Sequence, residues 1–207
     1  MSFFEVPGLF LIIAPPGSGK STLVKFDLFN GALLKTYDYA IVFTCTPYDY
    51  SFIPRKFIFT MFNESNIARI LKYQKENIHL RLLLIFDDMI GEAQFNTRLM
   101  NILVTQYRHY NVGLIITTQY VNKIPPTIRE SCSKAFILKL QTENAYKVCF
   151  ESFGCMFGKI STFKNYVEHN TRDHNFIVVN NRETSQNKRF TIKKIDVNSI
   201  PQSSLDF

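Results

Sequence analysis

Two short stretches of this sequence carry residues that could do chemistry on a phosphorylated ligand. The first, "APPGSGKST", follows an apolar run at Leu9 to Ala14. Glycines let a loop turn its backbone N–H groups toward phosphate oxygens, and a helix starting directly after the loop adds the positive end of its dipole. The stretch therefore predicts a phosphate-binding loop, with Ala14 in the place of the usual first glycine. Its nucleotide-binding residues would be Pro15, Pro16, Gly17, Ser18, Gly19, Lys20, Ser21 and Thr22.

Each part of this loop has a chemical role if the ligand is ATP. Lys20 can reach the β- and γ-phosphates, and the hydroxyl group of Ser21 can ligate Mg²⁺. A chance turn between a strand and a helix would not need a lysine and a hydroxyl at these two positions. The expected cofactors are therefore ATP and Mg²⁺.

The second stretch, "RLLLIFDDMIG", places Asp87 and Asp88 after an apolar run of strand length. Two adjacent carboxylates are costly to bury unless a cation compensates them. Ligands of open α/β sheets lie at the carboxyl ends of the strands, where these acids would be. We expect Asp87 to hold Mg²⁺ through water, and Asp88 to orient or deprotonate the attacking water. The alternative is that the pair caps the turn that follows.

A third stretch, "RHYNVGLIITTQY", reads as the end of a helix, a turn and an apolar strand with a polar end. If that strand lies beside the one ending in Asp87, Gln119 faces the same phosphates and can bond the γ-phosphate or the attacking water. Arg108 lies nine residues after Leu99, about half a turn away, so it should face outward. An outward arginine is either an ordinary solvated residue or one that reaches the site of another subunit.

These residues need a framework of alternating strands and helices. Strand-like runs are predicted at Leu9 to Ala14, Tyr39 to Thr44, Arg81 to Phe86, Val112 to Thr118 and Ala135 to Leu140. Helix-like segments are predicted at Ser21 to Asn30, Ser65 to Gln74, Phe95 to Tyr110 and Glu143 to Phe153. Near-continuous apolar strands alternating with helices are typical of a mainly parallel sheet covered on both faces.

The helix before the third stretch should bury one face. Its apolar residues at helical spacing are Phe95, Leu99, Ile102, Leu103 and Tyr107. After it, "HNFIVVN" and "RFTIKKI" predict a C-terminal β-hairpin. We expect a single ATPase domain over residues 1–207, with its core at about 9–150 and C-terminal helix and hairpin elements at about 151–207.

Composition sets further limits. The longest apolar runs fall far short of the roughly 18 residues that span a bilayer, and the N-terminus shows no secretion signal, so we expect an intracellular protein without a membrane segment. Four cysteines without a C-x-x-C pair fit a reducing compartment.

The formal net charge of +7 fits a nucleic-acid partner. The basic C-terminal segment is explained about equally well by DNA contact and by a lysine-protected sheet edge; it holds Arg182, Lys188, Arg189, Lys193 and Lys194.

Two other nucleotide-binding classes use the same loop. A GTPase needs an Asn-Lys-x-Asp motif, and in "VNKIP" Pro125 stands where the aspartate belongs, so this class is excluded. A small-molecule kinase would place arginines from a mobile lid over the phosphates. The segments "PRKF" and "IPPTIRES" offer such arginines, which leaves a P-loop kinase as the alternative function.

From about Leu9 to Phe150, the order "PPGSGKST", "LLLIFDD", "RHYNVGLIITTQ", "IPPTIRESCSKAFIL" resembles the FtsK–HerA superfamily of DNA-pumping ATPases. Within it, the chain is similar to the genome-packaging ATPases of poxviruses, other large eukaryotic DNA viruses and virophages. The resemblance implies a RecA-like P-loop NTPase fold and ATP hydrolysis coupled to translocation of double-stranded DNA into a capsid. It also implies a homo-oligomeric ring, a pentamer or hexamer, that docks on a capsid vertex protein. The expected place is the site of virus assembly in the host cytoplasm, or the virion itself.

The resemblance also implies residue roles. Asp87 and Asp88 would be the acidic pair, Gln119 the sensor, and Arg108 a finger acting on a neighbouring subunit, with Arg129 in "PPTIRES" as the competing candidate. One departure concerns Asp88, because many members of the superfamily have glutamate there. An aspartate is shorter by one carbon, about 1.5 Å. Either the loop brings Asp88 closer, or Gln119 shares the positioning of water.

Overall fold

An eight-stranded sheet forms the centre of the computed structural model, in the order β3-β2-β4-β5-β1-β6-β7-β8. The structure describes residues 3–4, 7–29, 36–89 and 97–195. The strands are β1 (Leu9–Ile13), β2 (Tyr39–Thr44), β3 (Ile58–Phe59), β4 (Leu82–Asp87), β5 (Val112–Thr118), β6 (Lys134–Ile137), β7 (Asn175–Asn180) and β8 (Phe190–Lys194). Strands β1 to β6 pair in parallel, whereas β6 with β7 and β7 with β8 pair antiparallel. The mainly parallel sheet with a C-terminal hairpin is confirmed.

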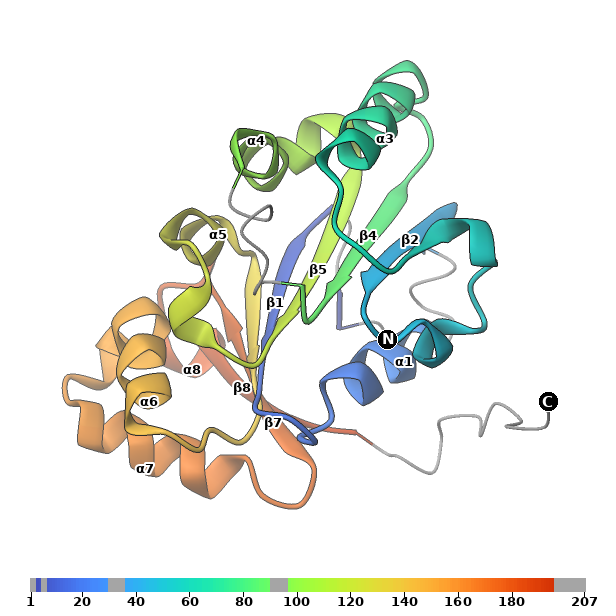
Figure 1. Ribbon diagram of the computed structural model, residues 1–207. Coiled ribbons are helices and arrows are strands. Elements are labelled where there is room, and N and C mark those ends of the chain that lie inside the picture. The colour runs from blue at the N-terminus through green and yellow to red at the C-terminus, as the bar shows by residue number, and fades with distance from the viewer. Residues whose placement is uncertain (1–2, 5–6, 30–35, 90–96, 196–207) are drawn as a thin grey trace.

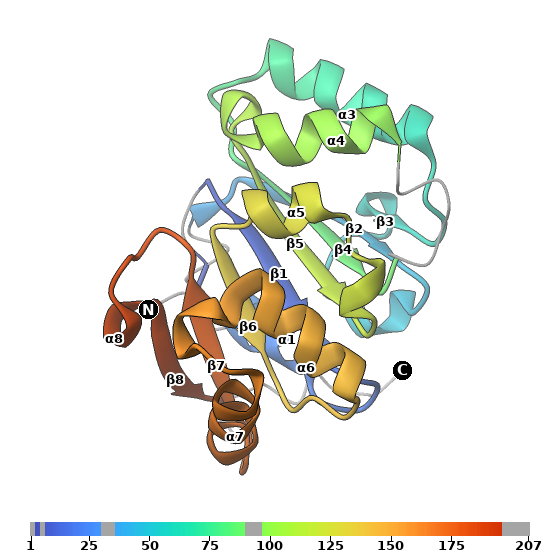
Figure 2. The same ribbon diagram turned by 90° about the vertical axis from the view of Figure 1, so that its left-hand side faces the viewer.

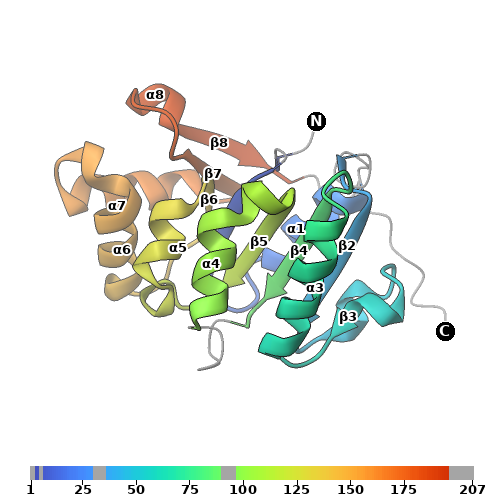
Figure 3. The ribbon, with the colours of Figure 1, turned by 90° about the horizontal axis from the view of Figure 1, so that it is seen from above.

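Helices cover both faces of this sheet (Figures 1 and 2). The described α-helices are α1 (Lys20–Phe29), α3 (Glu64–Glu76), α4 (Arg98–Gln106), α5 (Pro126–Ser131), α6 (Glu143–Cys149), α7 (Ile160–Asn170) and α8 (Gln186–Arg189). Viewed from above, α3, α4, α5 and α6 stand in a row along one face, while α1 lies on the other (Figure 3). The sheet is thus the middle of three layers.

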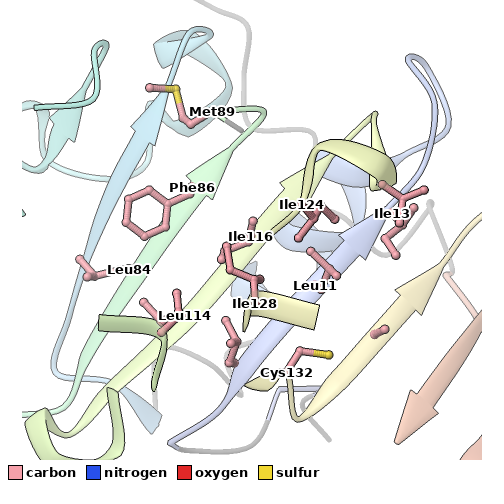
Figure 4. Close-up of a cluster of buried hydrophobic side chains, with 14 of the residues drawn as sticks. Leu11, Ile13, Leu84, Phe86, Met89, Leu114, Ile116, Ile124, Ile128 and Cys132 are labelled. Atoms are coloured by element: carbon pink, nitrogen blue, oxygen red, sulfur yellow. The ribbon is translucent and has the colours of Figure 1, made fainter. Parts of the chain in front are cut away.

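Side chains of β1 show why the sheet must be covered on both faces. Leu9, Leu11 and Ile13 join the core under α3 to α7, whereas Phe10 and Ile12 join the core under α1. All five are at most 1% exposed. The larger core continues across β4 and β5 through Leu84, Phe86, Leu114 and Ile116 (Figure 4). A continuous apolar run is therefore what a strand buried on both faces requires.

Polar caps end or begin several helices close to their predicted limits. Asn63 accepts a hydrogen bond from the backbone N–H of Ser65 at the start of α3, and Thr97 accepts one from Met100 at the start of α4. After α4, a 3-10 turn (Tyr107–Tyr110) closes on Asn111, whose φ of 52° lies in the left-handed region. This closure ends the helix and starts β5.

The sequence interpretation was wrong in detail on the helix before β5. Its buried residues are Met100, Leu103, Val104 and Tyr107, whereas Leu99 and Ile102 are only partly buried. The helical spacing was right, but the buried face of the helix is rotated by about one residue from the predicted face. Phe95, the first residue expected on that stripe, lies outside the described residues.

Other differences concern short elements. The strand expected at Ala135 to Leu140 is β6, which ends at Ile137, and the polar turn of the hairpin contains the short helix α8. Edge strand β3, helix α5 and the bounds of α7 were not predicted. Strand β8 is the other edge of the sheet, and Lys193 and Lys194 are exposed on it. This position fits a lysine-protected edge and leaves DNA contact as an open alternative.

Candidate active site

The loop between β1 and α1 is shaped for an anion. Gly17 and Gly19 have φ of 70° and 89°, in the left-handed region that side-chain-bearing residues rarely adopt. A Cβ atom at either glycine would meet no heavy atom closer than 4.0 Å, so the backbone conformation, not crowding, demands glycine. The space above the loop is open, and α1 begins at Lys20. Phosphate oxygens can therefore approach these backbone N–H groups.

Lys20 is a buried cation, only 6% exposed. Its ammonium group donates hydrogen bonds to the carbonyl oxygens of Ala14, at 3.0 Å, and Pro15, at 3.3 Å. It also lies 3.6 Å from Oδ2 of Asp88. A buried ammonium group needs anionic partners, and this position lets Lys20 exchange the Asp88 carboxylate for a phosphate group.

Asp87 is the last residue of β4 and is 3% exposed. Its Oδ1 accepts a hydrogen bond of 2.6 Å from the hydroxyl group of Thr117, and its Oδ2 accepts one of 3.2 Å from Ser21. Burial raises the pKa of Asp87, the bond from Thr117 lowers it, and the charge of Asp88 raises it again. The net direction is upward. A carboxylate held in this way is stabilised in its ionised form when a cation binds beside it.

Tyr50 was not predicted from the sequence as part of this site. Its side chain is fully buried, and its hydroxyl group has no hydrogen-bond partner among the described residues. The same hydroxyl group lies near enough to Asp87 to act on its pKa, but it does not reach the geometry of a hydrogen bond. Tyr50 is thus a buried neighbour of Asp87 whose hydroxyl group lowers the pKa of that carboxyl group.

Asp88 leaves the strand with a φ of 54°, an uncommon conformation for a residue other than glycine. Its backbone N–H donates to the hydroxyl oxygen of Thr117, at 3.0 Å, and its Oδ2 accepts a hydrogen bond of 2.8 Å from Nε2 of Gln119. Its side chain is 35% exposed. Strained backbone of this kind clusters at functional sites, and here it turns the carboxylate toward Lys20 and Gln119.

The oxygens of Ser21 and Asp87 fit a hard divalent cation. Mg²⁺ is bound through few protein oxygens at about 2.0–2.1 Å, which puts neighbouring ligand oxygens about 3 Å apart. The 3.2 Å between Ser21 Oγ and Asp87 Oδ2 is close to that spacing. The donor set therefore fits Mg²⁺, held by the Ser21 hydroxyl group and, directly or through water, by Asp87.

Thr117 lies at the polar end of β5, which the sequence interpretation placed along the ATP site, and it ties the two acids together through bonds that were not predicted. It is fully buried on β5 and is hydrogen-bonded to both the Asp87 carboxylate and the Asp88 backbone. Strands β4 and β5 pair in parallel up to Phe86 and Ile116, so Thr117 follows on β5 as Asp87 follows on β4.

The arginine candidates lie away from this cluster. Arg108 precedes β5, and the phosphate loop faces the opposite end of that strand (Figure 1). Seven residues of strand separate the two ends, roughly 20 Å at about 3.3 Å per residue. Arg108 is exposed, as predicted, and its Nε donates to the hydroxyl group of Tyr107. Arg129 is half-buried, and its Nη1 donates to Ser152 at 2.9 Å. Arg108 therefore does not reach the phosphate loop of its own chain.

No helix among the described residues is long and apolar enough to cross a membrane. Within the same residues no group of His, Cys, Asp and Glu has the arrangement of a metal site built from three or more such side chains.

Comparisons with known proteins show which family the chain resembles and which solved structures share its fold. The protein family described as "Poxvirus A32 protein" matches residues 3–203. An uncharacterized protein, 075L, of Invertebrate iridescent virus 6 is 26% identical over 181 residues, which span 83% of this chain and 69% of that protein. The family match covers both the phosphate loop and the C-terminal hairpin.

Two solved structures share the fold. The genome packaging NTPase B204 of Sulfolobus turreted icosahedral virus 2, in complex with ATP-gammaS, is 14% identical with a TM-score of 0.67, covering 91% of this chain and 98% of that one. B204 of Sulfolobus turreted icosahedral virus, described as a DNA-packaging ATPase, is 17% identical with a TM-score of 0.66, at the same coverage of 91% and 98%. The expected RecA-like P-loop fold is confirmed. Since the family match extends over nearly the whole sequence, this chain belongs to the Poxvirus A32 protein family.

Proposed function

We propose that this protein is a viral genome-packaging ATPase that couples ATP hydrolysis to the movement of double-stranded DNA into a capsid. The observation that carries the proposal is one network of hydrogen bonds and an ion pair at the carboxyl ends of three parallel strands. It joins Lys20, Asp88 and Gln119, and links Asp87 to Ser21 and Thr117. Membership of the family and the likeness to the B204 packaging enzymes support a packaging role.

Binding begins at the phosphate loop. The phosphate oxygens are neutralised by the N–H groups of residues 17–22 and by the ammonium group of Lys20. When Lys20 turns to the phosphate, its ion pair with Asp88 breaks. Mg²⁺, held by Ser21 and Asp87, would neutralise charge on the β- and γ-phosphates. Asp87 accepts bonds from Thr117 and Ser21, so its oxygens are oriented before the cation arrives. The fold therefore orients the Asp87 carboxylate before Mg²⁺ and the nucleotide bind.

Hydrolysis is assigned to Asp88 and Gln119. Once Lys20 turns to a phosphate, the Asp88 carboxylate is free to accept a proton from water, and the Gln119 amide bonded to it holds that water in line. The φ of 54° at Asp88 turns its carboxylate toward Lys20 and Gln119. Gln119 thus shares the positioning of water and senses whether the γ-phosphate is present.

Arg108 is proposed as a finger for the site of a neighbouring subunit. It is exposed just before β5 and far from its own phosphate loop, whereas Arg129 is half-buried and donates to Ser152. A guanidinium group supplied in trans stabilises the charge of the transition state. This assignment requires a closed homo-oligomer, a ring of five or six subunits, in which each Arg108 faces the next Asp88.

The remaining partners follow from the motor role. The net charge of +7 favours association with the DNA backbone, and a packaging motor must dock on a capsid vertex protein. Both, together with a place of action at the virus assembly site in the host cytoplasm or in the virion, are parts of the proposal.

Two variants test the site. Lys20→Ala should abolish nucleotide binding, since the phosphate loop loses its cation. Asp88→Asn should keep ATP binding but stop turnover, because asparagine tolerates a positive φ and cannot accept the proton. Lys25→Ala, which removes an α1 lysine paired with Asp49, is the matched control and should keep both properties. Undiminished hydrolysis in Lys20→Ala or Asp88→Asn would overturn the assignment.

Mixed oligomers test the finger. Neither Arg108→Ala nor Asp88→Asn subunits should hydrolyse ATP alone, but mixtures should recover activity wherever an intact Arg108 faces an intact Asp88. Arg98→Ala, an exposed arginine at the start of α4, is the control and should stay active alone. Absence of rescue at every mixing ratio would count against a trans finger. Transfer of phosphate to a small acceptor by a monomer would instead support the kinase alternative.

A further inference from the structure

A groove runs along one edge of the sheet, between helix α3 and strands β2 and β3. Its volume is about 810 Å³, within the roughly 300–1000 Å³ that is typical of ligand pockets. In Figure 3, α3 is the outermost helix of the row on its face, and β3 lies beyond it at the edge of the sheet. The helix therefore covers the outer strands only in part, and the groove is the space that it leaves open.

Aromatic side chains form the floor of this groove. They are Tyr39 on β2, Phe57 and Phe59 at and just before β3, and Tyr73 on α3. The first three are half-buried against the core under α3, and Tyr73 is 51% exposed. The hydroxyl group of Tyr39 donates to Oε1 of the fully buried Gln74 at 2.5 Å, which fixes this ring in the free protein. A floor formed in advance can bury an apolar side chain of a partner at a low cost in entropy.

Cations flank the aromatic floor on both sides. Lys56 lies in the turn before β3, and Arg69 and Lys72 lie on α3. All three are exposed, and none forms an ion pair with a carboxylate among the described residues. Of the described residues that line the groove, Glu76 is the only acid. The groove therefore carries an excess of positive charge that has no counterpart within the described chain.

The length and lining of the groove limit what it can bind. Helix α3 lines it from Asn66 to Glu76, about 15 Å at 1.5 Å per residue. An extended peptide of about five residues covers that length at about 3.3 Å per residue. Double-stranded DNA would pair with the cations, but its outer surface of phosphates has no apolar side chain for the floor, and Glu76 would repel it. The lining is thus complementary to an acidic peptide that carries an apolar side chain.

We propose that this groove docks an extended acidic segment of a partner protein, in which a large apolar side chain is flanked by carboxylates. The apolar side chain packs between Tyr39 and Tyr73, and the carboxylates pair with Lys56 on one wall and Arg69 on the other. Strand β3 offers an edge of only two residues, so specificity comes from side chains and not from strand addition. The residues that line the groove belong to neither the phosphate loop nor the acidic pair, so this docking does not depend on the ATPase assignment.

Binding of three labelled five-residue peptides, measured by fluorescence anisotropy, tests the docking. The first has phenylalanine between two pairs of glutamates, the second has lysines in place of the glutamates, and the third has alanine in place of the phenylalanine. The wild type should bind the first about 10-fold or more tightly than the other two. Arg69→Glu should weaken binding of the first peptide about 10-fold, because an attraction becomes a repulsion. Tyr73→Ala should weaken it about 5- to 10-fold, because the apolar side chain loses one wall.

Lys75→Glu is the matched control. It makes the same change in net charge as Arg69→Glu at an exposed position of α3 that does not line the groove, so it should bind the first peptide like the wild type. The docking is overturned if the lysine peptide binds as tightly as the glutamate peptide, or if Arg69→Glu and Tyr73→Ala both bind like the wild type. An equal loss in Lys75→Glu also overturns it, because the effect is then one of net charge.

Two other occupants give distinct results. If Arg69→Glu weakens binding of a short DNA duplex and leaves peptide binding unchanged, the groove is a nucleic-acid contact and the proposal fails. If Arg69→Glu or Tyr73→Ala lowers the oligomer mass measured by light scattering without peptide, the groove belongs to a second copy of this chain and the proposal also fails. Absence of ATPase activity in the wild type counts against the proposed function alone, since the peptide titrations need no nucleotide.

Discussion

Replacing Thr117 with valine should uncouple the two acids without changing the shape of the strand. The substitution removes the 2.6 Å bond to the Asp87 carboxylate and the 3.0 Å bond from the Asp88 backbone N–H. A hydrogen bond to a charged group is worth about 1.5–3 kcal/mol and a neutral one about 0.5–1.5 kcal/mol. We therefore expect a loss of about 3 kcal/mol in the free energy of unfolding. For a chain of this size, that lowers Tm by about 6–12 °C.

The same variant should change the pH dependence of hydrolysis. The bond from Thr117 lowers the pKa of Asp87 against the upward effect of burial, so its loss raises that pKa. Asp87 must be ionised to hold Mg²⁺, and the acid limb of the rate profile should therefore move to higher pH. The assays are thermal unfolding followed by circular dichroism and the ATPase rate measured across pH.

Thr44→Val provides the matched control. Thr44 is also fully buried, at the end of β2, and accepts a bond of 3.0 Å from the backbone N–H of Thr46. Its loss should cost about 1 kcal/mol and leave the acid limb in place. The reasoning is refuted if Thr117→Val changes neither Tm nor the acid limb, or if Thr44→Val moves the acid limb as far.

Two further predictions concern stability. Burial raises the pKa of Asp87. The stability that this group contributes is therefore fully present below its unfolded pKa and is lost as pH rises through the folded pKa. Bound Mg²⁺ compensates the ionised carboxylate, so Mg²⁺ should raise Tm at neutral pH and raise it progressively less in acid. An equal effect of Mg²⁺ on Asp87→Asn in a thermal melt would contradict this. Gly113→Ala should lower the free energy of unfolding by about 1–3 kcal/mol or more, because the added Cβ would lie 1.8 Å from the hydroxyl oxygen of Tyr37. A denaturant titration with an unchanged midpoint would show that Tyr37 moves aside freely.

Much of this arrangement was predictable because its signals are local. Glycines and a lysine directly after an apolar strand predict a phosphate loop, and an acidic pair after a second strand predicts its counterpart. Gln119 could be placed beside them because the carboxyl ends of parallel strands meet at one edge of a sheet. The structure brings these residues together, while their catalytic roles remain predictions.

Other features depend on contacts between distant parts of the chain and could not be predicted. Tyr50 lowers the pKa of Asp87 from a segment after β2 that has no motif of its own, and Thr117 bridges the acids only because β4 and β5 pair in that register. The positive φ of Asp88 has no signal in the sequence, since aspartate does not require it.

The ATPase rate of the purified protein with and without double-stranded DNA tests the central claim most directly. A packaging motor hydrolyses ATP to move DNA. The account therefore predicts a low basal ATPase rate that rises when double-stranded DNA is added, and no ATPase activity in Lys20→Ala. A rate that is the same with and without DNA would contradict the motor assignment, even if the phosphate loop binds ATP as proposed.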